Sequence, residues 1–417
     1  MQLTEHEQAI QAGEMGEARR RALAQQIEVG TFFDAEDFVE VAQAHIMADT
    51  ESLGEAGVSF MEELASGPKD ECRVIIPTIT DPRGADFNAY QRINHDEAYV
   101  ILERRADKAF RALGILMTDT CINYQTMMAP VKGEHLAMGD TGVVIYSNSV
   151  LGARTNYEGG PSALAAAMTG RTPRYGFHLD QHRRGTERFQ VEHRPSDWSD
   201  WGALGGMIGR HMGSYFQVPV IDGIVGAGPA PTSDDLKHFG AALASFGSTA
   251  LFHMVGVTPE APDLVTVFDG TPPDPHVITA GDFENFMNEY GGADDQLDVV
   301  VFAAPQLSLL EMEKLAALLD GQKVSDDVSV LIATNPENKH ASDRMGLTAT
   351  IEASGAIVLE GVCFYQMHAR ELGEANGWTR LMTNSAKLSN IIGGYGYDPT
   401  LASMERCIES AVKGRVV

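Results

Sequence analysis

The stretch from Val143 to Ala167 gathers small polar side chains around one arginine, a combination that suits the binding of a carboxylate or a phosphate. Arg154 offers a planar guanidinium that can hold such an anion through two parallel hydrogen bonds. Pro161 precedes an alanine-rich segment, which is typical of a helix start whose free N–H groups attract anions. The candidate residues are Ser147, Asn148, Ser149, Arg154, Asn156, Gly159, Gly160 and Ser162. An ordinary loop, whose Asn and Ser side chains hydrogen-bond their own backbone, fits the same residues.

Thiol and imidazole groups are the next candidates. Cys121 lies in a hydroxyl- and amide-rich segment after a predicted helix, where it is either a ligand or an inert buried thiol. His178 and His182 flank Asp180, and they are either ligands and acid–base groups or structural histidines. The four cysteines (Cys72, Cys121, Cys363, Cys407) lack zinc-type spacing. In a chain without an export signal, they are expected to be reduced thiols or cluster ligands.

Several elements are predicted to position these residues. The apolar run 143–146 predicts a buried strand that leads into the polar loop and then the helix. Residues 1–66 and 98–116 are predicted to be helical, and 73–78 and 250–257 to be strands. Residues 201–212 are rich in glycine but lack a dinucleotide fingerprint, so they indicate close packing.

The C-terminal third has the clearest pattern. Strands are predicted over 297–302, 328–333, 356–361 and 380–383, and helices over 309–319, 339–353, 368–375 and 401–413. This alternation predicts parallel βαβ units, in which ligands bind beyond the carboxyl ends of the strands. Three loops (303–306, 362–364 and 384–387) are then expected to share one rim. The rim would contain Cys363, Asn384, Ser385 and Lys387.

Length and charge limit the class of protein. A chain of 417 residues exceeds one ordinary core, and we predict a helical segment over 1–66, an α/β region over 67–290 and a parallel βαβ domain over 291–417. A formal charge of −27 argues against nucleic-acid and anionic-membrane partners. The N-terminus lacks signal-peptide features and no run is long enough to span a membrane, so a cytoplasmic location is predicted.

Four motifs carry a resemblance to a known family: SNSVLGARTNYEGGPSALAAAMTGRTPRYGFHLD, TDTCINY, LFHMVGVTPEAP and TNSAK. They resemble the large subunit of aconitase X proteins over almost the whole chain. The resemblance implies an aconitase-like α/β fold with several domains, in which parallel sheets are flanked by helices. It also implies an iron–sulfur-dependent hydro-lyase and a separate small subunit, the swivelling domain, that supplies a catalytic serine.

The resemblance also implies a reaction and its residues. The first expectation is dehydration of cis-3-hydroxy-L-proline to Δ1-pyrroline-2-carboxylate, and the alternative is dehydration of mevalonate 5-phosphate. Cys121 and Cys363 match cluster cysteines, whereas the loop that carries a further ligand in some members reads Ala303-Ala304-Pro305-Gln306. Cys407 is either the third ligand or a core residue, and a 2Fe-2S cluster is favoured over 4Fe-4S or 3Fe-4S.

The elimination of water needs stabilisation of a growing negative charge, a Lewis acid for the hydroxyl, and a base for the α proton. Residues expected to take part in catalysis are Ser149, Arg154, His178 and Lys387. Because the third-ligand loop lacks Cys and His, a second expectation is a subunit that lacks the cluster and serves binding or assembly.

Overall fold

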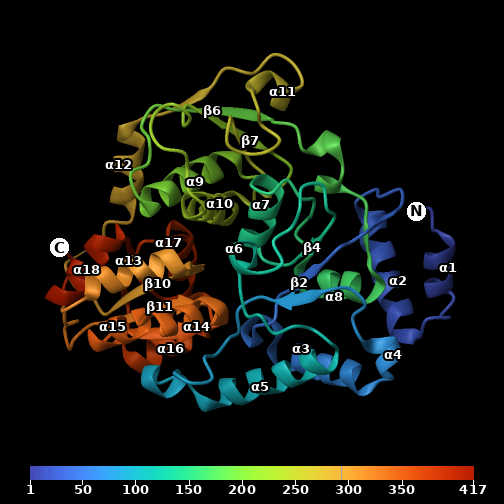
Figure 1. The fold of residues 1–417 in the computed structure, drawn as a ribbon, viewed down its shortest axis with the longest axis horizontal. Helices are drawn as coiled ribbons and strands as arrows, with labels where there is room; N and C mark the ends of the chain where they lie inside the picture. The colour runs from blue at the N-terminus through green and yellow to red at the C-terminus, as the bar shows by residue number, and fades with distance from the viewer. Residues whose placement is uncertain (293) are drawn as a thin grey trace.

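Three lobes make up the computed structural model, which describes residues 1–292 and 294–417 (Figure 1). The N-terminal lobe lies on the right of the view, the middle lobe at the top and the C-terminal lobe at the lower left. Each lobe contains a parallel sheet with flanking helices, so the predicted α/β class with parallel sheets is confirmed. Among the described residues, no helix is both long enough and apolar enough to cross a bilayer.

The N-terminal lobe is built on a sheet with the strand order β3-β2-β4. These strands are β2 (Ala44–Ile46), β3 (Thr78–Thr80) and β4 (Ala137–Met138), and all of their residues are buried. The lobe's helices are α1 (Glu5–Gln11), α2 (Glu17–Phe32), α3 (Thr50–Ser66), α4 (Lys69–Cys72), α5 (Glu97–Ala112), α6 (Asn123–Thr126), α7 (Thr141–Ser149) and α8 (Gly159–Thr169). A short pair, β1 (Phe38–Glu40) and β5 (Arg171–Pro173), is antiparallel.

Three local predictions in this lobe are wrong. Residues 73–78 are not a strand, because only Thr78 belongs to β3. Residues 1–66 are not helical throughout, because they contain β1 and the buried strand β2. Residues 143–146 lie in α7, where the Asp140 side chain caps the helix by accepting a hydrogen bond from the Val143 N–H at 3.0 Å. Residues 142–149 are buried all round, so α7 shows no polar face. A short apolar run of this kind cannot be distinguished from a buried strand by periodicity.

The middle lobe has a parallel sheet with the order β8-β7-β6-β9. Its strands are β6 (Glu187–Val191), β7 (Pro219–Asp222), β8 (His253–Met254) and β9 (His276–Ile278), and its helices are α9 (Trp198–Met212), α10 (Ser233–Gly247), α11 (Leu264–Phe268) and α12 (Ala280–Glu289). A Cβ on Gly209 of α9 would lie 2.8 Å from the Leu243 carbonyl oxygen of α10. The prediction that the glycine-rich segment serves close packing is therefore confirmed.

The C-terminal lobe follows the predicted alternation. Its parallel sheet has the order β12-β11-β10-β13-β14, with β10 (Val299–Leu307), β11 (Ser329–Thr334), β12 (Ile357–Glu360), β13 (Arg380–Thr383) and β14 (Asp398–Leu401). Its helices are α13 (Leu309–Leu319), α14 (Pro336–Met345), α15 (Leu347–Ala353), α16 (Ala369–Asn376), α17 (Ala386–Ile392) and α18 (Met404–Lys413). The sequence analysis did not predict β14. The domain boundaries at residues 66 and 290 stay predictions.

Candidate active site between two sheet edges

The carboxyl ends of the N-terminal and C-terminal sheets meet at one place. Asp81 follows β3 and Asp140 follows β4, while Gln306 is near the end of β10 and Cys363 follows β12. The Arg83 N–H donates to the Gly361 carbonyl at 2.8 Å, which ties the two edges together. Ligands of parallel sheets bind at such edges, so this junction is the candidate active site.

Two thiols lie in contact at this junction. Cys121 is 5% exposed and Cys363 is 1% exposed, and the Cys363 side chain lies close enough to Cys121 to shift the pKa of its thiol. This contact and burial raise the pKa of the Cys121 thiol well above its ordinary range. Gln306 holds the Cys121 loop, because its backbone N–H donates to Cys121 Sγ (3.4 Å) and its Oε1 accepts from the Cys121 N–H (3.2 Å). The two thiols are therefore held next to each other at this junction.

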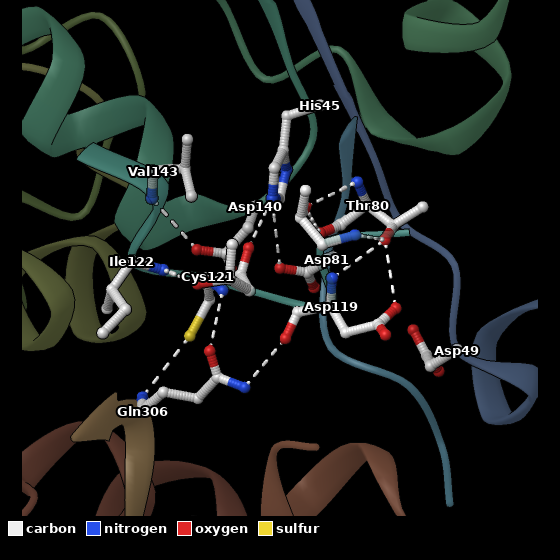
Figure 2. A network of polar contacts seen from close by, with 12 residues as sticks. His45, Asp49, Thr80, Asp81, Asp119, Cys121, Ile122, Asp140, Val143 and Gln306 are labelled. Atoms are coloured by element: carbon white, nitrogen blue, oxygen red, sulfur yellow. Dashed lines mark hydrogen bonds and ion pairs between the residues drawn. The ribbon is translucent and has the colours of Figure 1, made fainter. Parts of the chain in front are cut away.

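Buried carboxylates lie near Cys121 on the side of the N-terminal lobe (Figure 2). Gln366 donates to Asp81 Oδ2 at 2.8 Å and to Asp49 Oδ2 at 3.3 Å. The pKa of Asp81 lies well above its ordinary value, first because of burial and then because of the neighbouring Asp140 and Cys121. Asp81 therefore tends to keep its proton, as an acid–base group in a buried site does.

Lys387 supplies the positive charge of the site. Its Nζ lies 3.6 Å from Asp140 Oδ1, donates to Thr141 Oγ1 at 3.3 Å and lies 5.6 Å from the Tyr365 ring centre. Burial lowers the pKa of Lys387, but the nearby Asp140 and the two thiols raise it by more, so the net shift is upward. Lys387 is thus a permanent cation next to the sulfur pair.

Several buried polar atoms at this junction have no hydrogen-bond partner among the described residues: Asp81 Oδ1, His45 Nδ1, Gln366 Oε1, and both side-chain polar atoms of Asn123. Unpartnered buried polar atoms are costly and point to a bound ion or ligand. The other ring nitrogen of His45, Nε2, lies 3.6 Å from Asp81 Oδ1. Two thiols, an unpartnered carboxylate oxygen and a lysine fit an iron centre whose sulfur ligands are Cys121 and Cys363.

Comparisons with known proteins identify the family of this chain. Sequence profiles of the aconitase X first, second and third domains match residues 1–181, 185–288 and 297–413. The chain belongs to the aconitase X family. The crystal structure of Thermococcus kodakaraensis aconitase X in its holo-form superposes with a TM-score of 0.85 at 28% identity, covering 99% of this chain and 100% of that one.

Two relatives of this aconitase X chain have named activities. The phosphomevalonate dehydratase large subunit of Methanothermobacter thermautotrophicus is 34% identical over 389 residues, which cover 93% of each chain. The cis-3-hydroxy-L-proline dehydratase of Pseudomonas aeruginosa is 31% identical over 413 residues, which cover 98% of this chain and 70% of that one. Both are dehydratases, so the predicted family and the predicted hydro-lyase class are confirmed.

The structure of this chain brings the predicted rim loops together. Gln306 Nε2 donates to the Val362 carbonyl (3.1 Å) and to the Asp119 carbonyl (3.0 Å), and Ser385 Oγ donates to the Ala304 carbonyl (2.5 Å). Ser385 also caps α17, so its hydroxyl is committed to structure. Asn384 is buried next to it, in the loop that leads to Lys387.

Most polar residues of the stretch from Val143 to Ala167 form hydrogen bonds that stabilise the fold. Asn148 donates to the Thr155 and Ala250 carbonyls, each at 2.9 Å. Asn156 donates to the Tyr175 carbonyl at 3.1 Å, and Ser149 Oγ accepts from the Phe252 N–H at 2.9 Å. Ser147 Oγ is buried and has no partner among the described residues. The interpretation as a loop or helix that satisfies its own backbone therefore fits Asn148, Ser149 and Asn156.

Arg154 and His178 form a cluster of their own. Arg154 Nη1 donates to the His178 carbonyl at 2.9 Å, and Nη2 is paired with Asp180. His178 Nδ1 lies 2.9 Å from His135 Nδ1, and burial with the neighbouring His178 lowers the pKa of His135 to about 4. Residues 176–178 and 180–182 form two 3₁₀ turns and not the face of a strand. Arg154 is thus engaged by this segment and does not contact the thiols.

Cys407 does not join the sulfur pair. It is fully buried in α18 within the apolar core of the C-terminal lobe, and its thiol lies 3.8 Å from the Ala402 carbonyl. The prediction of Cys407 as a third ligand is wrong, because an apolar sheet–helix core surrounds this thiol. Burial raises the pKa of Cys407, as expected for an inert thiol.

The start of α8 remains available for an anion. Its N-cap residue Glu158 makes no side-chain cap, and the Glu158 N–H donates to the Met138 carbonyl at the end of β4. Open space surrounds Gly159, and only the Met47 carbonyl, at 3.8 Å, would lie near a Cβ on Gly160. The helix start therefore lies at the same sheet edge as Asp140, and Ser162 lies in its first turn.

Sequence analysis missed the acidic residues of the site. Asp49, Asp81 and Asp140 each follow a strand of two or three residues, and so short a strand carries little periodic signal. Asp81 directly follows the buried strand β3, and a carboxylate in that position lies at the ligand-binding edge of a parallel sheet. That position in the chain is the signal that could have found them.

Proposed function

We propose that this aconitase X chain removes water from a small β-hydroxy acid, and that the substrate is cis-3-hydroxy-L-proline, which would yield Δ1-pyrroline-2-carboxylate. The observation that carries the proposal is the buried Cys121–Cys363 pair facing Asp81 and Lys387 across two sheet edges. Family membership supports the reaction class.

An iron–sulfur cluster is part of the proposal, with Cys121 and Cys363 as its protein sulfur ligands. When bound, the cluster would supply a Lewis acid for the substrate hydroxyl. Gln306 occupies the loop expected to bear a further ligand, and both ends of its side-chain amide are used by backbone groups. With two thiols brought together, a 2Fe-2S cluster is favoured over larger ones.

Residues of this chain then handle the protons and charges. Burial raises the pKa of Asp81, so Asp81 is the group proposed to give a proton to the departing hydroxide. Lys387 offsets the negative charge of the thiolates and of the growing enolate. The α8 start, with Gly159, Gly160 and Ser162, is the proposed carboxylate site, and Asn384 lines the rim. Arg154, His178, Ser147 and Ser149 are proposed to act by positioning this machinery.

The charge of the site favours a zwitterionic substrate. Cations near the junction are already paired with acids: Arg83 with Asp119, Lys237 with Glu311, and Lys387 with Asp140. Asp81 and Asp49 are buried acids without a lysine or arginine partner among the described residues, so they offer a phosphate no cation. A phosphorylated substrate would need cations from the partner subunit.

Mevalonate 5-phosphate is the second candidate, and one observation favours it. The relative that is 34% identical and matches this chain over 93% of both lengths is a phosphomevalonate dehydratase large subunit. The description of that relative as a large subunit also supports a small partner subunit, which would supply the serine base. We propose a cytoplasmic location for the pair.

The test is turnover by the iron-loaded chain with its small subunit. We expect pyrroline-2-carboxylate from cis-3-hydroxy-L-proline and no product from mevalonate 5-phosphate. Product from the phosphorylated substrate alone would reverse the substrate assignment. A colourless, iron-free protein after anaerobic reconstitution would favour the non-catalytic binding role.

A further inference from the structure

A second group of metal-type donors lies in the middle lobe. The side chains of Glu187, His211 and His276 bring one ligand atom each to within 4.8 Å of the others. His211 Nε2 lies 2.9 Å and His276 Nε2 lies 3.3 Å from the same carboxylate oxygen, Oε2 of Glu187. Two imidazoles and one carboxylate thus converge on one point.

Three secondary-structure elements build this convergence. Glu187 begins β6, His276 begins the neighbouring parallel strand β9, and His211 lies in the last turn of α9. His276 pairs in register with Phe189, two residues after Glu187, so the strand period puts Glu187 and His276 on one face. The Phe189 ring packs against both imidazoles, 5.3 Å from each ring centre. The donors are therefore held by the fold.

The carboxylate is oriented by a further contact. Gln217 Nε2 donates to Glu187 Oε1 at 3.2 Å, so Oε2 is the oxygen left for the two histidines. Hydrogen bonds that orient a ligand in this way are typical of metal sites. The helix adds to the attraction, because His211 lies at the C-terminal end of α9, where backbone carbonyls favour positive charge.

We propose that Glu187, His211 and His276 bind a divalent transition-metal ion of the zinc class. Imidazole nitrogen selects such ions over Mg²⁺ and Ca²⁺, which prefer oxygen ligands. A tetrahedral ion with bonds of about 2.0–2.1 Å needs donors roughly 3.3 Å apart, and the two imidazole nitrogens lie 2.9 and 3.3 Å from Glu187 Oε2. The His211 and His276 side chains are 42% and 50% exposed, so water completes the coordination.

The site joins β6, β9 and the end of α9, and so it acts as a metal clamp on the outer part of the middle lobe. Metal binding to the folded state alone would raise the thermal midpoint. This role needs no contact with the dehydratase site and does not depend on the proposed function. Its test is therefore metal binding and not turnover.

The experiment is a calorimetric titration of the iron-loaded protein with Zn²⁺, because iron keeps the active-site thiols occupied. The wild type is expected to bind one zinc equivalent that His276→Ala and Glu187→Gln lose, while the exposed-histidine control His340→Ala keeps it. His276 is half exposed and Gln preserves the shape of Glu187, so both variants should fold, which circular dichroism would verify. Co²⁺ in the same site should give a spectrum without thiolate bands. Equal zinc binding by the wild type, His276→Ala and Glu187→Gln, or no binding by the wild type, would overturn the proposal.

Discussion

The thiols of Cys121 and Cys363 are neighbours, although Cys121 comes from the N-terminal lobe and Cys363 follows a strand of the C-terminal lobe. Neither lobe alone has both thiols. Two sheet edges must therefore meet before the site exists, and each prediction below perturbs one part of that junction.

Replacement of either thiol should abolish iron binding. Cys121→Ala and Cys363→Ala are each expected to yield colourless protein after anaerobic reconstitution, because one remaining thiolate cannot hold the cluster. The controls are Cys72→Ala and Cys407→Ala, whose thiols lie in other apolar clusters and should leave the iron content unchanged. Iron per chain and visible absorbance are the measurements, and iron retained by either of the first two variants would refute the ligand assignment.

Removal of the buried cation should weaken both iron binding and folding. Lys387→Met leaves Asp140 without its partner, and breaking a buried ion pair costs about 3–5 kcal/mol. Loss of the ammonium also removes a stabiliser of the thiolates, so iron affinity and turnover should fall together. Chemical denaturation and iron titration would check this, and an unchanged iron affinity would show that Lys387 does not act on the sulfurs.

Substitution of Gln306 should separate the two sheet edges. Gln306→Ala removes hydrogen bonds to Cys121 and to the Asp119 and Val362 carbonyls, leaving buried groups unpaired at about 1–3 kcal/mol each. We expect a lower thermal midpoint and loss of iron on gel filtration. The exposed control Gln322→Ala should behave like the wild type. A Gln306→Ala protein with wild-type stability and iron retention would contradict this role.

Arg154→Lys should impair turnover without unfolding the chain. Lysine cannot make both contacts of the guanidinium, to the His178 carbonyl and to Asp180, so the 176–182 segment would lose its orientation. Asp180 is 87% exposed, so the stability cost should stay below about 1 kcal/mol. Turnover and thermal midpoint are the measurements. Full activity in Arg154→Lys would exclude a positioning role.

The stability of the iron-free protein should fall as the pH rises from 5 to 8. Burial raises the pKa of Glu103 from 4.5 to about 8, while the unfolded chain releases this proton near its ordinary pKa. In that window the unfolded state is favoured by proton release, so the free energy of unfolding decreases. In Glu103→Gln the free energy of unfolding should fall less over this pH range, with a difference from the wild type of up to a few kcal/mol. The exposed control Glu97→Gln should match the wild type. Urea unfolding at pH 5 and pH 8 tests this, and parallel curves for Glu103→Gln and the wild type would contradict it.

The accuracy of the sequence analysis followed the strength of local signals. The C-terminal lobe was predicted well because strands such as β10 and β11 are long apolar runs that alternate with capped helices, as in α13 after Ser308. That alternation also placed Cys363 and Lys387 at one edge. The N-terminal sheet was not predicted, because a strand such as β2 has three buried residues and no alternation.

The polar residues were harder to assign than the fold. Asn148 and Asn156 have the types expected of a binding loop, but their partners are backbone groups brought close only by tertiary structure. Conversely, the only sequence signal of Asp81 is its position after a very short strand, and the shift of its pKa comes from burial beside Asp140 and Cys121. Cys407 lies in the same C-terminal lobe as Cys363, but its thiol belongs to an apolar core.

The most direct test of the central claim is anomalous diffraction at the iron edge from crystals of the anaerobically reconstituted protein. The account predicts an iron peak within bonding distance of both Cys121 Sγ and Cys363 Sγ, facing Asp81 and Lys387. An iron peak bound to neither sulfur, or no iron at this junction, would contradict it.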